Sequence, residues 1–136
     1  MKIESIAGFA CITREPAASA ALYRDALGLP LQQMEDYLFL DRFPGAQHFG
    51  VWPLAMAARS CFGLDEWPDN IPEPAATIEF ELADVAAVEA AVQELEDRGQ
   101  VFVHRARTEP WGQTVARFVS PEGVLVGLSH TPWLHP

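Results

Sequence analysis

Residues 76–99, ATIEFELADVAAVEAAVQELEDRG, carry the clearest structural pattern in the sequence. Apolar and polar residues alternate through residues 76–82, as expected for a strand with one buried face. Asp84 is a good helix N-cap, apolar residues then recur at helical spacing, and Gly99 ends the pattern. The stretch therefore predicts a strand followed directly by an amphipathic helix.

The same order of elements occurs near the N-terminus. Residues 3–13, IESIAGFACIT, form an apolar strand-like run, and Glu15 and Pro16 then open an alanine-rich stretch that ends at Gly28. A proline just inside the start and a glycine just past the end are typical of a helix. Glu15 and Asp84 lie 69 positions apart (84 − 15), and this spacing indicates an internal repeat.

Three short strands are predicted after each helix, because short apolar runs there are bounded by turn residues. Their expected ranges are 31–36, 37–42 and 47–54 in the first half, and 100–107, 112–119 and 124–130 in the second. Each half is then a βαβββ module, and the fold class is α+β with mixed sheets. We place module one at about residues 3–63, a proline-rich linker at 64–75, module two at 76–130 and a C-terminal tail at 131–136.

Composition and charge restrict the partners of the chain. Its 136 residues, 49% apolar and 21% charged, fit a single domain. Nineteen acidic against nine basic residues give a formal charge of −10, so nucleic acid and anionic membranes are poor partners. No apolar run is long enough to span a membrane and no signal peptide is visible, which favours a cytoplasmic location. The acidic excess serves solubility or attracts a cationic ligand.

The repeat and two local motifs together suggest a family. A duplicated βαβββ module with ALYRDALGL (residues 21–29) and WGQTVARFVSPEG (residues 111–123) resembles the vicinal oxygen chelate superfamily. That superfamily includes glyoxalase I, extradiol dioxygenases and bleomycin resistance proteins, and the resemblance covers roughly residues 3–130. It implies cup-shaped sheets, one ligand cavity formed by two modules, and a homodimer, which would also protect the open sheet edges.

The resemblance also implies four metal-ligand positions on the first and last strands of the modules. By the spacing usual in the family, these positions fall on Gly8, Thr77 and Gly127 and near Gly50. Glycine has no side chain that could coordinate an ion, and a threonine hydroxyl is a poor ligand for transition metals. We therefore expect no metal and no cofactor. The glycines either leave the cup unusually roomy and permit close backbone approach, or they mark strand bends or bulges.

Strand parity predicts which side chains line the cup. The ligand-binding candidates are Trp52, His48, Gly50, Glu79, Glu81, Trp111, Gln113 and Ser129. Several alternatives remain open: the two carboxylates either meet a ligand or form a solvated strand face, and each tryptophan either stacks on a ligand or packs in the structure. His48 with one of the carboxylates is a less orthodox metal or acid–base site. Arg117 is expected to pair with a neighbouring carboxylate.

No residue is assigned a catalytic role, because the sequence lacks the usual nucleophile, phosphate-loop and zinc motifs. The favoured function is a small-molecule binding protein of the bleomycin-resistance type. It would bind and sequester a bulky aromatic, possibly cationic antibiotic or natural product. Such drug binding would make the cell resistant to the antibiotic. The alternative is a metal-dependent lyase, isomerase or dioxygenase of the same superfamily. A third reading is an interaction module with a vestigial cup.

Overall fold

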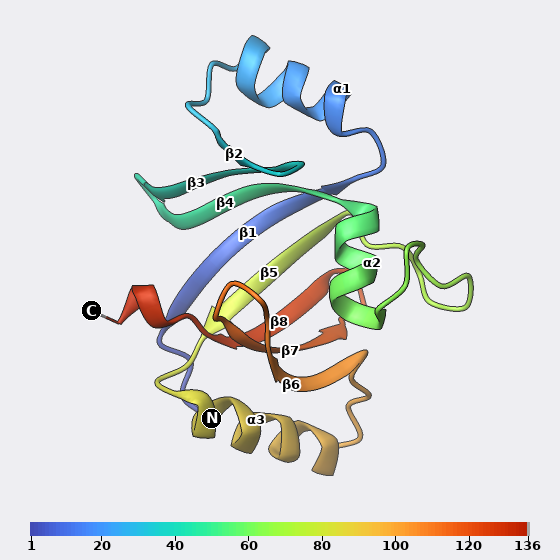
Figure 1. Cartoon of the computed structure of the whole chain (residues 1–136). Coiled ribbons are helices and arrows are strands. Elements are labelled where there is room, and N and C mark those ends of the chain that lie inside the picture. Colours follow the sequence, from blue (N-terminus) through green and yellow to red (C-terminus); the bar gives the residue numbers. More distant parts are fainter. Residues whose placement is uncertain (136) are drawn as a thin grey trace.

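A computed structural model describes residues 1–135, and Pro136, the last residue of the predicted tail, lies outside the described residues. Within residues 1–135, eight strands form one sheet in the order β2-β3-β4-β1-β5-β8-β7-β6 (Figure 1). The strands are β1 (Ser5–Thr13), β2 (Gln32–Met34), β3 (Tyr37–Phe43), β4 (Ala46–Pro53), β5 (Ala76–Glu81), β6 (His104–Thr108), β7 (Thr114–Val119) and β8 (Leu125–His130).

The repeat predicted from the sequence is present in the strand pairing. Within each module the first and last strands pair in parallel, β1 with β4 and β5 with β8. Strands β1 and β5 then pair antiparallel at the centre, where Gly8 lies opposite Glu79 and Ala10 opposite Thr77. This confirms the α+β class with tandem βαβββ modules, although the two modules share a single curved sheet.

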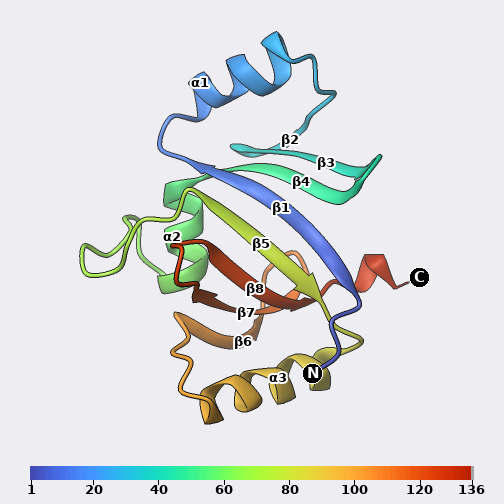
Figure 2. The ribbon, with the colours of Figure 1, turned by 180° about the vertical axis from the view of Figure 1, so that it is seen from behind.

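Two helices cover the outer face of the sheet at opposite ends of the molecule (Figures 1 and 2). In module two, α3 (Val85–Asp97) begins at the predicted cap, because the Asp84 carboxylate accepts a hydrogen bond from the Ala87 amide at 2.7 Å. In module one, α1 (Pro16–Ala20) passes into a π-helical segment, η1 (Ala21–Ala26). The single α-helix expected there is therefore wrong in detail, since its second half is wound more widely.

A third helix, α2 (Leu54–Phe62), is absent from the predicted element order. Its sequence, LAMAARSCF, spans only nine residues and has no side-chain N-cap and no acidic residue in its first turn, so no start signal marks the helix. The helix ends at Gly63, which has a positive φ of 70°. Figure 1 shows α2 in front of the sheet, and Figure 2 shows it behind the sheet. On the other side, which faces the viewer in Figure 2, no helix lies over β1 and β5.

Helix α2 fills one end of the concave face with apolar side chains. Ala57 and Ala58 are fully buried, and the core around them includes Trp52, Leu125 and the linker residue Trp67. Trp67 packs edge-on against Phe62, as the sequence predicts for a tryptophan in a long loop. The chain ends in a short 3-10 turn, η2 (Pro132–Leu134). No helix within residues 1–135 is long and apolar enough to cross a membrane.

Candidate functional site

A line of paired residues crosses the concave face of the sheet and forms the candidate site. Asp41 on β3 is paired with His48 on β4. His48 lies beside Gly8 on β1, which is opposite Glu79 on β5. Glu79 is paired with Gly127 on β8, and Gly127 with Arg117 on β7. We call Asp41, His48, Gly8, Glu79, Gly127 and Arg117 the central row.

The glycines of the cup are positions of close packing. A Cβ atom at Gly50 would lie 2.1 Å from the Tyr37 hydroxyl oxygen, so this ring occupies the space above Gly50. A Cβ at Gly8 would lie 3.1 Å from the Cβ of His48, and one at Gly127 would lie 3.0 Å from the Cγ of Glu79. The prediction of a roomy cup is therefore wrong, because neighbouring side chains fill the space above these glycines. A shift in the pairing register between Ile6 and Gly8 agrees with the alternative of a strand bend or bulge at Gly8.

The row contains a carboxylate–imidazole–phenol chain. His48 Nδ1 lies 2.7 Å from the Asp41 carboxylate, to which it donates, and Nε2 then accepts from the Tyr37 hydroxyl at 2.5 Å. Burial raises the pKa of Tyr37 well above its usual range, and the charges of Glu79 and Asp41 raise it further. Tyr37 therefore keeps its proton and acts as a donor.

Phe39 adds a third ring beside the Tyr37 and His48 rings of this chain. The Phe39 ring is stacked on both Tyr37 and His48, with ring centroids 5.6 and 5.8 Å apart. All three residues are partly exposed. They form an aromatic panel at one side of the central row.

At the other side of the row, Arg117 is fully buried in a polar cluster. Its Nη1 donates to Glu109 at 3.0 Å and to the Ser60 hydroxyl of α2 at 2.9 Å. Its Nη2 lies 3.6 Å from Glu79, which confirms the expected pairing with a carboxylate. Nη1 also lies 3.2 Å from His104 Nε2, and burial together with Arg117 lowers the pKa of His104 to about 4.

Trp52 does not line open space in this structure. Its side chain is buried in the core beneath α2, and the Arg117 guanidinium lies 5.2 Å from its ring centroid. Of the two alternatives for Trp52, packing within the structure is the one observed. Helix α2, which covers this side chain, was not predicted from the sequence. The cation–π contact ties Trp52 to the polar cluster.

Glu81 and Ser129 share the concave face with Glu79 but are covered by the end of the chain. Both side chains are buried, and Ser129 donates to Glu81 at 3.1 Å. The Thr131 amide donates to the same carboxylate at 2.6 Å. A ligand could reach this pair only if the tail moved.

Trp111 and Gln113 connect the rim to the central row. Trp111 is 47% exposed, and its indole N–H donates to the side-chain oxygen of Gln113 at 2.9 Å. Gln113 in turn donates to Glu79 at 3.1 Å. Trp111 is therefore the most accessible of the predicted aromatic candidates.

Sequence reasoning missed Tyr37, Asp41 and Glu109 as members of the site. Tyr37 and Asp41 share strand parity with Phe39 in the predicted strand 37–42, and that parity was the available signal. Glu109 follows the end of β6, and a position in a loop gives no comparable signal.

Among residues 1–135, two of the cavities lie beside the sheet. One of about 880 Å³ lies between the β3–β4 hairpin, β1 and residues 133–134, and it is lined by Gly8 and His48 of the central row. It is also lined by Ile6, Phe9 and Ile78, by Phe43, Trp133 and Leu134, and by the charged side chain of Arg42. This volume is within the range of small-molecule sites.

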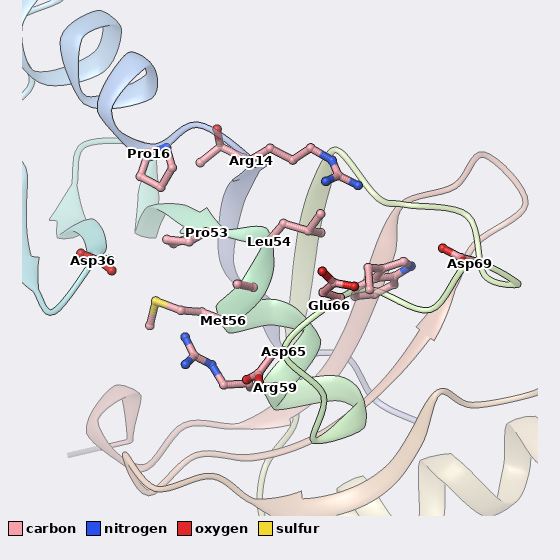
Figure 3. Close-up of a pocket in the computed structure, with 13 residues that line it drawn as sticks. Arg14, Pro16, Asp36, Pro53, Leu54, Met56, Arg59, Asp65, Glu66 and Asp69 are labelled. Atoms are coloured by element: carbon pink, nitrogen blue, oxygen red, sulfur yellow. The ribbon is translucent and has the colours of Figure 1, made fainter.

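The other cavity, of about 470 Å³, lies at the C-terminal end of β1, beside the start of α2 and the linker (Figure 3). Its charged lining residues are Arg14, Asp36, Arg59, Asp65, Glu66 and Asp69. None of the predicted ligand-binding residues lines it.

The four positions implied for a metal do not fit an ion in this structure. Gly8, Gly50 and Gly127 supply no donor atom, and their surroundings are filled by neighbouring side chains. The Thr77 hydroxyl is buried and has no hydrogen-bond partner among the described residues. One neutral hydroxyl is not a transition-metal site, so no step is derived through a metal there.

The family model described as the Glyoxalase/Bleomycin resistance protein/Dioxygenase superfamily matches residues 5–128. The chain therefore belongs to this superfamily. No curated protein matches the sequence significantly.

Solved structures show the same fold at low sequence identity. A superfamily member from Vibrio splendidus 12B01 has a TM-score of 0.57 at 13% identity, with 90% of this chain and 96% of that chain covered. Methylmalonyl-CoA epimerase from Streptomyces coelicolor has a TM-score of 0.55 at 16% identity, with 96% of each chain covered. A structure described as an NAD-dependent benzaldehyde dehydrogenase from Legionella pneumophila has a TM-score of 0.59 at 11% identity, with 90% and 96% covered.

Proposed function

We propose that the chain is a binding protein with no metal at the family's ligand positions, and that it sequesters a bulky aromatic, cationic molecule, as a bleomycin resistance protein would. The observation that carries this proposal is the replacement of the metal positions. Side chains of Tyr37, His48 and Glu79 pack over glycines where the family would place ligands. The concave face then offers aromatic and charged groups to a ligand and no coordinating cluster at those positions.

The charge of the concave face supports a cationic ligand. Four carboxylates lie on or beside this face, and two guanidinium groups accompany them. The carboxylates are Asp41, Glu79, Glu81 and Glu109, and the guanidiniums are Arg107 and Arg117. An excess of negative charge attracts cations and adds selectivity more than raw affinity.

The aromatic groups support a planar ligand. The panel of Tyr37, Phe39 and His48 is partly exposed, and Trp111 stands at the rim with nearly half of its surface in solvent. Aromatic stacking is worth on the order of 1 kcal/mol beyond area burial. Contact is proposed first with His48, Glu79 and Trp111, whereas Gln113 is buried, so contact with it would require a neighbouring side chain to move. Contact with Trp52, Gly50, Glu81 and Ser129 would require α2, Tyr37 or the tail to move.

A second candidate function is acid–base catalysis by His48, favoured by its contact with Asp41. An imidazole held by a carboxylate through Nδ1 presents Nε2 as a base. In this structure Nε2 is occupied by the Tyr37 hydroxyl, so a substrate would have to displace that phenol. Such an enzyme would be an isomerase or lyase that uses no metal. It therefore differs from the metal-dependent lyase, isomerase or dioxygenase considered in the sequence analysis.

We also propose a homodimer formed through the outer face of β1 and β5. Figure 2 shows this face between α1 and α3 without a helix over it. Ile6 is 53% and Phe9 is 42% exposed there, beside the partly exposed Ile78 and Phe80. Exposed apolar patches of this kind commonly mark interfaces.

Titration of the protein with metal-free bleomycin in the presence of a chelator tests the proposed binding. We expect saturable quenching of tryptophan fluorescence, with one ligand per chain and intact ligand in the recovered sample by mass spectrometry. The Trp111→Ala variant should bind about five- to tenfold more weakly. Chemically altered ligand would instead support the His48 enzyme, and absence of binding across a panel of cationic aromatic compounds would contradict both the charge and the stacking arguments.

A further inference from the structure

A cluster of two histidines and a carboxylate lies away from the family's metal positions. Glu81 is at the end of β5, His130 at the end of β8, and His135 follows η2. One ligand atom from each of the three lies within 4.8 Å of the others. Glu81 is four residues beyond Thr77, so this cluster does not coincide with the four positions of the central face.

The carboxylate at the centre of the cluster is buried and fixed in place. Its Oε1 accepts from Ser129, and its Oε2 accepts from the Thr131 amide at 2.6 Å and from His135 Nε2 at 2.8 Å. Glu81 is 1% exposed. A buried carboxylate held this firmly is a preorganised ligand, because little freedom is lost when a cation binds.

Both imidazoles converge on one oxygen of that carboxylate. His130 Nδ1 donates to the Leu82 carbonyl oxygen at 3.4 Å and lies 3.8 Å from Glu81 Oε2, so it would have to leave that carbonyl to bind an ion. The two imidazole ring centroids are 4.7 Å apart. Ligand atoms of a tetrahedral zinc site, with bonds of about 2.0–2.1 Å, lie about 3.3 Å apart. The distances of 2.8 and 3.8 Å bracket this value, so modest side-chain shifts would create a three-ligand site.

A second carboxylate supports the outer histidine. Glu4 Oε2 lies 3.9 Å from His135 Nδ1, the nitrogen that points away from Glu81. Metal-bound histidines commonly direct their other ring nitrogen to a carboxylate, which orients the ring and raises its basicity. The arrangement therefore provides three ligands and an orienting group.

We propose that Glu81, His130 and His135 bind one divalent transition metal ion, such as zinc, and that this ion fastens the C-terminal segment over the end of the concave face. Two imidazoles and a carboxylate suit zinc chemically. The ion would replace the hydrogen bond between His135 and Glu81. The expectation that the protein holds no metal concerned only the family's four ligand positions, and none of these three residues occupies one of them.

The test is a titration of untagged, chelator-treated protein with Co²⁺ and then Zn²⁺. We expect one Co²⁺ per chain with the visible absorption of a low-coordinate site, displaced by one equivalent of Zn²⁺. Zn²⁺ at about 100 times its dissociation constant should raise the Tm by roughly 5–10 °C.

Variants locate the site. His135→Ala and His130→Ala should each weaken Co²⁺ binding at least about 100-fold, because loss of an orienting group alone costs about 10–100-fold. His135→Gln keeps an amide donor for Glu81 but removes the imidazole, and it should also lose the metal. The matched control is His104→Gln, which removes a histidine outside both this cluster and the central row and should bind Co²⁺ as the parent does.

Three outcomes would overturn this site: no saturable Co²⁺ or Zn²⁺ binding by the folded parent, binding that survives in both His130→Ala and His135→Ala, or binding lost only in His104→Gln. Circular dichroism and the Tm of each metal-free variant establish that it is folded. The proposed ligand binding in the central row is measured separately with chelator present, so failure of the metal site would leave that proposal standing.

Discussion

Gly50 shows at the scale of one residue how this chain departs from the metal-binding pattern of its superfamily. The Tyr37 hydroxyl oxygen occupies the space that a side chain at position 50 would need. Tyr37 is held there by His48, which is held in turn by Asp41. The position of the Tyr37 ring therefore depends on the absence of a side chain at position 50.

Gly50→Ala should lower the free energy of unfolding by about 1–3 kcal/mol, because the new methyl group forces the Tyr37 ring to move. Gly127→Ala is the matched control and should cost less, since the atoms it meets belong to the more flexible side chain of Glu79. Urea denaturation measures both. Most of the cost at Gly50 should disappear in a Tyr37→Ala background; an undiminished cost there would show that Tyr37 is not its cause.

His104 should make stability depend on pH. The Arg117 guanidinium can only donate, so His104 Nε2 must accept from it, and Nδ1 donates to the Arg105 carbonyl at 2.8 Å. The pKa of His104 is lowered from 6.5 to about 4 in the folded state. Between these values the unfolded chain binds the proton and the folded chain does not, so stability falls as pH decreases from 6.5 to 4.

The comparison with His104→Gln isolates this contribution. Over that window the parent should lose about 2 kcal/mol more than the variant, a value reduced for partial solvent access. Chemical denaturation at pH 7 and pH 4 gives the difference. Parallel pH profiles of the two proteins would exclude His104 as the titrating group.

At the scale of elements, the polar cluster joins α2 to the β6–β7 hairpin. Ser60 on α2 and Arg117 on β7 share the Glu109 carboxylate, and all three side chains are buried. Glu109→Gln should destabilise the fold by about 3 kcal/mol, the lower end for breaking a buried ion pair, because Glu79 still faces Arg117. Thermal unfolding checks this, with Glu122→Gln on the exposed turn as a control expected to be nearly neutral.

The same elements show what could be predicted from sequence. The strand-cap-helix order around Asp84 was predictable because its apolar periods are clear and its ends are marked. The parity of strands 47–54 and 76–82 likewise placed His48 and Glu79 on one face. Helix α2 was not predictable in this way, because it begins directly after strand β4 and has no side-chain cap to mark its start. The burial of Trp52 was missed because α2 covers it. The burial of Glu81 was missed because the residues that cover it, Thr131 and His135, are about 50 positions away in the sequence.

At the scale of the whole molecule, the outer face of β1 and β5 should be an interface. Light scattering at tens of micromolar should give about 30 kDa, twice the 15.0 kDa of one chain. Phe9→Glu should shift the mass toward the monomer, because it puts charge into the apolar patch. The edge strands β2 and β6 offer another route to assembly. A parent mass near 15 kDa would contradict the dimer, and a dimer unaffected by Phe9→Glu would move the interface to those edges.

The measurement that tests the central claim most directly is the affinity of metal-free bleomycin for the parent and for Glu79→Gln, by calorimetry with chelator at low and high salt. We expect the variant to bind about tenfold more weakly at 20 mM salt and less than about threefold more weakly at 500 mM, because salt screens a partly wet carboxylate. Glu122→Gln removes the same charge outside the cup and should match the parent. Equal affinities of folded parent and Glu79→Gln at low salt would contradict an acidic binding site in the central row.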